Sequence, residues 1–340
     1  MYSARSIISA IAFPAILFYS CSKPTAPEEP KPSYFSYLGI SRLCWHDISV
    51  PYGLHDEYTA PQKMNFKAKV SYYTIAQSHL TYGNILGQYY NGYSMDEVPV
   101  LNVIYTPENK GAYNTGAGMG NAAMSWGGLQ RLSAPEEMQY SPESKAIQIW
   151  MRIEKAPADA KLYIDLGRVS EDIIPNNRLD TEDKNFNGLL ELGEDNGIDG
   201  LKDEQEASYN ALTNPDPSAD DFNFSPSSAI YTDINGTENN ALSTDWGRLP
   251  DTEDLNGNYY LDTQNDFFRY EIPLSSDAKV NKYITETGAD GWMKLRIPLS
   301  EYKFLSGTPA EYSLPVLKLW FSGVSERIHL QFAELRVAGK

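Results

Sequence analysis

Short runs of alternating apolar and polar residues, rich in β-branched and aromatic side chains, dominate this chain from about residue 66 onward. Alternation with a period of two places the apolar side chains on one face of a strand. It is clearest at Arg327–Val337, where Ile328, Leu330 and Phe332 alternate with His329, Gln331 and Ala333. The other predicted strands are Ala146–Ile153, Lys161–Gly167, Phe268–Leu274, Trp292–Leu299 and Val316–Gly323.

Helical periodicity is scarce along the same chain. Only the region from about Lys67 to Gln88 suits a helix, and its three tyrosines and two glycines weaken that interpretation. Short strands separated by Gly, Pro, Asn and Asp turns predict an all-β fold, specifically a jelly-roll-like β-sandwich. A long acidic, Asp/Asn-rich loop insertion at about residues 176–266 interrupts the strand pattern. Loops of such length in compact domains usually carry function.

The N-terminus has the features of an export signal. Arg5 precedes an apolar run, Ile7–Tyr19, that is shorter than the ~20 residues of a membrane-spanning helix. We therefore expect residues 1–20 to form a signal peptide. The junction before Cys21 resembles a bacterial lipoprotein cleavage site, which makes Cys21 the expected lipid attachment residue. An ordinary signal peptide with an incidental cysteine is the alternative.

A proline-rich stretch follows the predicted cleavage site. Residues 21–34 hold four prolines and are interpreted as a stiff tether, so that residues 35–340 form the folded domain. The expected location is the outer membrane, at the cell surface or the periplasmic face, with membrane contact only through the lipid. With Cys21 lipidated, Cys44 is expected to be a buried free thiol.

The chain has a formal net charge of −17, and most of it is local. Residues 180–206 contain ten acidic and two basic side chains, and residues 251–266 contain five acidic and none basic. An acidic chain does not suit nucleic acid, whose binding depends on Lys and Arg, and it disfavours anionic membrane surfaces. The acidity therefore calls for a local explanation.

A repeated motif accounts for much of this charge. The sequence Asp-Thr-Glu-Asp occurs at residues 180–183 and again at 251–254. We name the twelve residues from each final aspartate the first acidic loop, Asp183–Glu194, and the second acidic loop, Asp254–Asn265. Oxygen-bearing side chains recur at positions 1, 3, 5 and 9 of both loops, and these residues are Asp183, Asn185, Asn187, Glu191, Asp254, Asn256, Asn258 and Asp262.

This spacing matches that of calcium-binding loops, which supply six to eight oxygen ligands from alternate residues. The first loop has Gly188 for the turn at position 6, the carbonyl of Leu189 at position 7 and Glu194 at position 12. The second loop has Tyr259 at position 6 and Asn265 at position 12, so it should bind more weakly or complete its shell from elsewhere. Calcium is thus predicted as a structural cofactor.

Two further interpretations of the insertion stay open at this stage. The Asn-Gly pairs of both loops also suit simple solvated turns. Asp195, Asp199 and Asp203 could in turn serve a second ion. Crowded carboxylates repel one another, which favours a bound cation.

Motifs for catalysis are lacking, since the sequence contains no GxSxG, HExxH, P-loop or GxGxxG pattern. The protein is therefore predicted not to be an enzyme, with a hydrolase using carboxylates of the insertion as a minor alternative. The 24 tyrosines and six tryptophans suit either the core of a sandwich or an exposed platform for sugars or a protein.

Several segments resemble, in order, a repeated module in the N-terminal part of the gliding-motility protein SprA (Sov), the outer-membrane translocon of type IX secretion. The resemblance covers roughly residues 66–340 and includes Lys69–Ile75, Pro99–Thr115, Ser125–Leu132, Ile147–Ile153, Lys161–Asp183, Asp251–Asp262, Trp292–Tyr302 and Leu317–Gly339. The chain is short and lacks repeated ten-residue lipid-facing strands, so the pore function is not expected here. The resemblance implies a detached extramembrane module with its own lipid anchor.

The expected function is a non-catalytic, lipid-anchored, calcium-stabilised interaction module at the outer membrane, associated with type IX secretion or gliding. Its partner would be an envelope protein. The last third of the chain also resembles the closing strands of carbohydrate-binding jelly rolls, so a module for envelope or extracellular glycans is the alternative.

Overall fold

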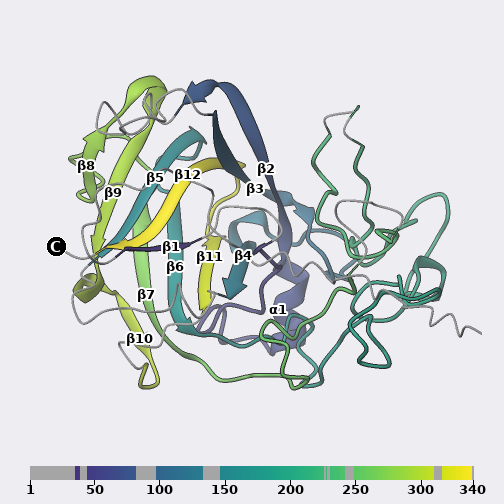
Figure 1. Cartoon of the computed structure of the whole chain (residues 1–340). Coiled ribbons are helices and arrows are strands. Elements are labelled where there is room, and N and C mark those ends of the chain that lie inside the picture. Colours follow the sequence, from purple (N-terminus) through teal and green to yellow (C-terminus); the bar gives the residue numbers. More distant parts are fainter. Residues whose placement is uncertain are drawn as a thin grey trace, which may run out of the picture.

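A computed structural model of the chain describes residues 35–38, 44–81, 97–132, 146–225, 227, 230–241, 249–309 and 316–338. Its strands form two antiparallel sheets that pack face to face, with long loops to one side (Figure 1). The predicted all-β sandwich is therefore confirmed. None of the helices in the described ranges is long and apolar enough to cross a membrane.

The larger sheet has seven strands in the order β2-β3-β12-β5-β9-β8, with β1 also pairing with β12. Its strands are β1 (Phe35–Leu38), β2 (Ala68–Thr81), β3 (Glu97–Lys110), β5 (Ala146–Lys155), β8 (Ile284–Thr287), β9 (Met293–Pro298) and β12 (Ile328–Ala338). The long strand β12 pairs with β3 through its first half and with β1 through its second half.

The smaller sheet has five strands in the order β10-β7-β6-β11-β4. Its strands are β4 (Trp126–Leu132), β6 (Lys161–Arg168), β7 (Asp266–Pro273), β10 (Phe304–Ser306) and β11 (Val316–Ser322). Helical segments are short, and they are α1 (Ala60–Lys63), η2 (Met64–Phe66), η3 (Ala122–Met124), η4 (Asp203–Gln205), η5 (Ala289–Gly291) and η6 (Leu299–Glu301).

The core lies between the two sheets and is built by the alternation seen in the sequence. Ile328, Leu330 and Phe332 are buried in it, as predicted. A register shift after Phe332 keeps the apolar face inward, because Leu335 and Val337 are also part of the core. All six predicted strands correspond to strands of the structure, with differences of a few residues at their ends.

Two expectations from the sequence are wrong. Residues 68–81 of the region expected to suit a helix form strand β2, because pairing with β3 from Ala68 to Thr81 decides the conformation over local propensity. Cys44 is buried but is disulfide-bonded and not a free thiol. The sequence contains one other cysteine, Cys21, which lies outside the described residues together with the predicted signal peptide and the whole tether.

A segment after Cys44 covers the outer face of the smaller sheet. His46 pairs with Gln130 of β4, and the backbone carbonyl of Ser49 accepts a hydrogen bond from Lys318 Nζ at 2.8 Å. The Arg269 guanidinium binds both carboxylate oxygens of Asp165 and also donates to the carbonyl of Tyr52. Buried polar groups therefore fasten this segment to the sheet.

Candidate functional site

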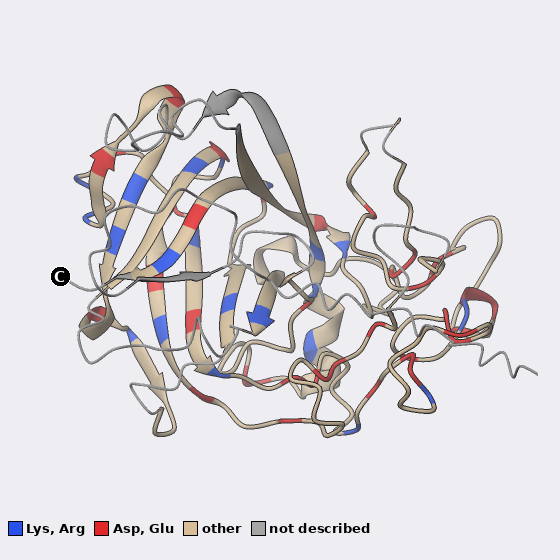
Figure 2. Ribbon diagram, viewed as in Figure 1, with Lys and Arg blue, Asp and Glu red and all other residues tan. Residues whose placement is uncertain are grey.

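The acidic insertion connects two neighbouring strands, so both of its ends leave the sandwich at one place. Arg168 at the end of β6 pairs with Asp266 at the start of β7, and residues 169–265 lie between them. Within the described part of this stretch, η4 is the only helix, and isolated bridges take the place of strands. Figure 2 shows the acidic residues of this region, coloured red, along loops beside the sandwich.

The two Asp-Thr-Glu-Asp motifs lie against each other. Thr181 and Thr252 form an antiparallel bridge. Glu182 N donates to the carbonyl of Asp251 at 2.9 Å, and Glu253 N donates to the carbonyl of Asp180 at 3.1 Å. The repeat in the sequence is thus a pair in space, and the two acidic loops leave this bridge in equivalent ways.

The glutamate of each Asp-Thr-Glu-Asp motif binds the backbone of the other motif, in a symmetric arrangement. The Glu182 carboxylate accepts hydrogen bonds from Asp251 N at 2.8 Å and Asn196 N at 3.0 Å. The Glu253 carboxylate accepts from Asp180 N at 3.0 Å and Ile174 N at 2.8 Å. Both glutamates are fully buried, and burial raises the pKa of each to about 8. They fix the bases of the loops and are not positioned as exposed ligands.

The first acidic loop folds around the carboxylate of Asp183. This carboxylate accepts hydrogen bonds from Asn187 N at 2.9 Å and Gly188 N at 2.7 Å. Asn185 Nδ2 donates to Glu191 at 2.6 Å, which brings positions 3 and 9 together. The predicted residues of this loop therefore converge, and Leu189 N caps the turn by donating to Asn187 Oδ1.

The second acidic loop repeats this arrangement. The Asp254 carboxylate accepts hydrogen bonds from Asn258 N at 3.1 Å and Tyr259 N at 2.6 Å. Asn256 Nδ2 donates to Asp262 at 2.7 Å, and Asn258 Nδ2 donates to the same carboxylate at 3.1 Å. Positions 1, 3, 5 and 9 are therefore brought together in both loops.

Tyr259 does not destroy the turn at position 6. Its φ of 65° is left-handed, like the φ of 75° at Gly188 in the first loop. At position 4 the residue types are reversed, with Phe186 at φ 58° and Gly257 at φ 69°. Each loop thus has one glycine and one aromatic residue at its two left-handed positions, and the two rings meet edge to face at 5.7 Å.

Position 12 differs between the loops, and the structure shows how the difference is resolved. In the first loop, Glu194 N donates to the carbonyl of Glu191, at position 9, at 3.1 Å. The Glu194 carboxylate accepts hydrogen bonds from Lys184 N, at position 2, at 3.2 Å and from Glu191 N at 2.8 Å. Asn265 of the second loop instead accepts from Ser170 N, outside the loop.

Glu171 takes the place of Glu194 in the second loop. Glu171 N donates to the carbonyl of Asp262 at 2.8 Å. Its carboxylate accepts from Leu255 N at 3.2 Å and Asp262 N at 3.1 Å, which are again positions 2 and 9. Burial and the carboxylates of Asp262 and Asp254 raise the pKa of Glu171 to about 7. Sequence reasoning missed this residue because it precedes the loop by more than eighty positions.

A pocket of about 180 Å³ lies between the two loops. Its walls come from matching positions on both sides, which are Leu179, Thr181, Asp183, Phe186 and Gly188 from one side and Pro250, Thr252, Asp254, Gly257 and Tyr259 from the other. The position 1 aspartates of both loops therefore border one shared space.

The additional acids named from the sequence separate in space. Asp195 accepts hydrogen bonds from Asn240 N and Ala241 N, whereas Asp199 and Asp203 join a second group of carboxylates. That group also contains Glu206, Asp216, Asp220, Asp221 and Glu238, which the sequence analysis did not name. Their separation along the chain gave no motif to recognise.

The aromatic residues of the described ranges are partly in the core and partly exposed, and two exposed groups lie at the acidic loops and near strand β10. All five tryptophans in the described ranges are buried, and they are Trp45, Trp126, Trp150, Trp292 and Trp320. Near strand β10, Tyr52 is 48% exposed and Phe304 is 40% exposed, with ring centroids 6.1 Å apart. Tyr302 and Leu305 are exposed to similar degrees. Among the described residues, an aromatic platform for a ligand near β10 would therefore consist of tyrosine and phenylalanine and not of tryptophan.

A scan against family models finds no match for this chain, and a search of curated proteins finds none. Among solved structures, the chain is similar to a family 11 carbohydrate-binding module from Clostridium thermocellum, described in complex with a β-1,3-1,4-mixed-linked tetrasaccharide. The TM-score is 0.35 at 9% sequence identity, over 90% of this chain and 95% of the module.

Proposed function

We propose that this protein is an exported, non-catalytic interaction module whose β-sandwich carries a pair of calcium-binding loops. The observation that supports the proposal most strongly is the repeated geometry of the two loops, including the substitution of Glu171 for the missing position 12 acid. Oxygen-bearing side chains are held by matching hydrogen bonds at equivalent positions in both loops, and oxygen donors suit calcium.

In this proposal the first site uses Asp183, Asn185, Asn187, Glu191 and Glu194, with the carbonyl of Leu189. The second uses Asp254, Asn256, Asn258 and Asp262, completed by Glu171. Calcium here would fasten the insertion to the sandwich, because Ser170 and Glu171 directly follow β6 and contact the second loop.

Calcium titration tests the loop sites. An ion that binds only the folded state stabilises it by mass action, by about 2.7 kcal/mol at a hundredfold excess over its dissociation constant. Melting should therefore rise with millimolar calcium and fall with chelator, and Asp183→Ala should reduce the response. An unchanged melting temperature in wild type would refute the loop sites.

We further propose that the mature protein is anchored through lipid on Cys21 and acts at the outer membrane beside a type IX secretion or gliding apparatus. Lipid attachment requires that the disulfide of Cys44 be absent from the mature protein, because the sulfur of Cys21 cannot carry both a lipid and a disulfide bond. Intact mass of the mature protein distinguishes them. Affinity capture should recover envelope proteins, and recovery of background proteins alone would count against this setting.

Glycan binding is the second candidate, and the exposed aromatic group near β10 favours it. Flat rings of this kind can stack on sugar faces, and Arg269 lies 5.4 Å from the Phe304 ring. A glycan array should then give signals that Tyr52→Ala and Phe304→Ala abolish. Tyr260→Ala is the matched control, because Tyr260 is 74% exposed but belongs to the second acidic loop.

A further inference from the structure

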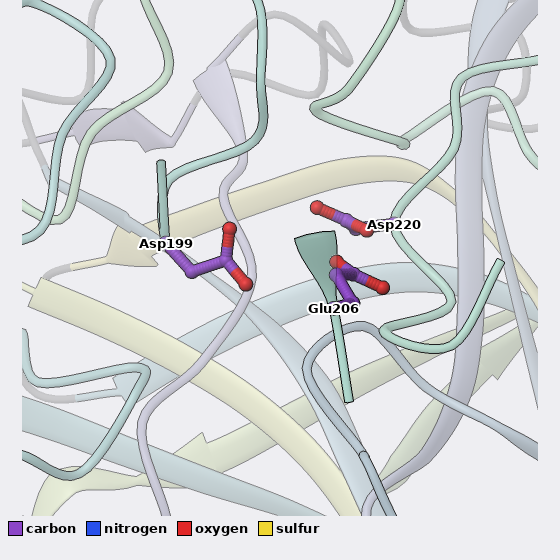
Figure 3. A group of neighbouring side chains, drawn as sticks. All are labelled: Asp199, Glu206 and Asp220. Carbon is purple, nitrogen blue, oxygen red and sulfur yellow. The ribbon is translucent and has the colours of Figure 1, made fainter. Parts of the chain in front are cut away.

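A second set of acidic side chains gathers in the insertion, apart from the paired loops. Seven carboxylates belong to it, and we name them the carboxylate centre: Asp199, Asp203, Glu206, Asp216, Asp220, Asp221 and Glu238. Figure 3 shows Asp199, Glu206 and Asp220 directed toward one another across a small space.

The centre consists of three overlapping groups, each with ligand oxygens within 4.8 Å of one another. The first is Asp199, Glu206 and Asp220, the second is Asp203, Glu206 and Asp216, and the third is Asp203, Asp221 and Glu238. Glu206 and Asp203 each belong to two groups. The carboxylates therefore form a chain of adjoining sites with two shared members.

Several of these side chains are buried with one carboxylate oxygen that has no hydrogen-bond donor in the described part of the chain. Asp220 is 0% exposed, Glu238 3% and Glu206 6%. Within the described residues, no hydrogen-bond partner reaches Asp220 Oδ1, Glu238 Oε2 or Glu206 Oε1, nor Asp203 Oδ1. A buried carboxylate oxygen without a partner is costly, and four of them in one cluster indicate a ligand.

Protein cations do not neutralise the centre. Over the described ranges, no Lys, Arg or His lies within 4.0 Å of any of its carboxylate oxygens. Lys69 nearby pairs with Asp233, and Lys110 Nζ donates to the carbonyl of Pro217. Burial and the surrounding carboxylates raise the pKa of Asp220 to about 9 and that of Glu238 to about 8.

The backbone is shaped to bring these groups close together. A Cβ on Gly197 would lie 2.2 Å from Asp220 Oδ2, and one on Gly236 would lie 2.2 Å from the backbone of Asp221. Asp221 and Glu238 are held side by side by a parallel bridge. Tyr113, which follows β3, ties the centre to the sandwich, because Ile198 N donates to its hydroxyl at 3.1 Å.

We propose that the carboxylate centre binds more than one calcium ion, with Glu206 and Asp203 bridging neighbouring ions. The donors are all oxygen, which selects hard cations, and neither His nor Cys belongs to the groups. The large number of flexible carboxylates suits calcium better than magnesium, which keeps much of its water. The site does not depend on the paired loops, since no residue is shared.

The experiment uses the full chain with both loop sites disabled by Asp183→Asn and Asp254→Asn. Calcium content per chain is measured by elemental analysis after equilibration with calcium chloride and removal of free ion. This variant should retain at least two ions per chain, and it should melt at a higher temperature in calcium than in chelator. A calcium content at the level of buffer would overturn the proposal.

Two further substitutions test whether the retained ions lie at the carboxylate centre. Asp220→Asn and Asp203→Asn are each introduced into the double loop variant and, separately, into wild type. Each should lower the calcium content by at least one ion, whereas the exposed Asp277→Asn should leave it unchanged. In chelator near pH 7, Asp220→Asn should leave the melting temperature close to that of its parent, because a carboxyl with a pKa of about 9 is already uncharged there. Unchanged calcium content in both variants would overturn the assignment. If the paired loops bind no calcium but the carboxylate centre does, wild type and the double loop variant should contain the same amount of calcium per chain.

Discussion

The sandwich and its insertion have opposite interiors. The space between the sheets is filled by apolar side chains such as Leu166, Leu319 and Phe332, all without exposure to solvent. The insertion instead buries carboxylates, among them Glu182, Glu253 and Asp220. Apolar burial stabilises a fold without any added component, whereas buried carboxylates require donors or cations. Backbone N–H groups meet this requirement at Glu182 and Glu253, and the proposed calcium ions would meet it at the carboxylate centre.

The same contrast recurs on a smaller scale between the two acidic loops. The first loop carries its position 12 acid within its own twelve residues, and the second takes Glu171 from the segment that follows β6. The second loop is therefore coupled directly to the sandwich. Calcium binding by the second loop should therefore depend on the position of Glu171 in the segment after β6.

The largest expected effect concerns the apolar interior. Phe332→Ala should lower the free energy of unfolding by about 3 to 5 kcal/mol, because the ring is fully buried in the core. The loss should be equal in calcium and in chelator, measured by denaturant unfolding. Phe304→Ala, at a residue that is 40% exposed and lies outside the insertion, is the matched control. If the loss of stability caused by Phe332→Ala differed strongly between calcium and chelator, the stabilities of the sandwich core and the insertion would not be independent.

The smaller sheet contains one buried polar group that should respond to pH. Burial lowers the pKa of Lys318 to about 7, against neighbours Asp165, Arg269, Lys67 and Asp47. The folded state thus disfavours the charged ammonium, so stability should rise as pH increases from about 7 to the ordinary lysine value of 10.5. Lys318→Met should remove this rise, which is on the order of a few kcal/mol.

The free energy of unfolding of wild type and of Lys318→Met, measured by denaturant unfolding across this pH range, tests the prediction. Lys279→Met serves as the control, since Lys279 is exposed. Parallel curves for wild type and Lys318→Met would show that Lys318 keeps its proton in the fold.

The two loops can be compared through their equivalent acids. Glu194→Gln should weaken calcium binding of the first loop, and Glu171→Gln that of the second, each by about tenfold or more. Calorimetric titration of both variants and of the double variant measures the effects separately. Glu57→Gln is an exposed control outside the insertion. If Glu171→Gln left the titration unaltered, Glu171 would not be the counterpart of Glu194.

The smallest expected effect concerns the left-handed positions. At residue 186, glycine should give a more stable protein than alanine by about 1 kcal/mol, because φ is 58° and both substitutions remove the ring. The same difference is expected at residue 259, where φ is 65°. Thermal unfolding of the four variants measures both differences. A preference for alanine at one site would show that the loops are not equivalent there.

Much of the sandwich could be read from the sequence, because alternation reports directly which side chains point inward. The runs at 146–153, 161–167 and 327–337 all became strands of the two sheets. The region near Lys67 was misjudged because its pattern is ambiguous and long-range pairing with β3 decides it. Local sequence patterns also could not predict which strands are neighbours in the two sheets.

For the candidate site, the sequence alone determined the repeated acidic loops, since their oxygen-bearing residues are close together and recur at the same spacing. Only the tertiary structure decided that the loops pair through Thr181 and Thr252, that Glu171 serves the second loop, and that distant acids form the carboxylate centre. The physical reason is distance along the chain. Local spacing encodes a turn, but contacts between remote segments depend on how the sheets place the ends of the insertion.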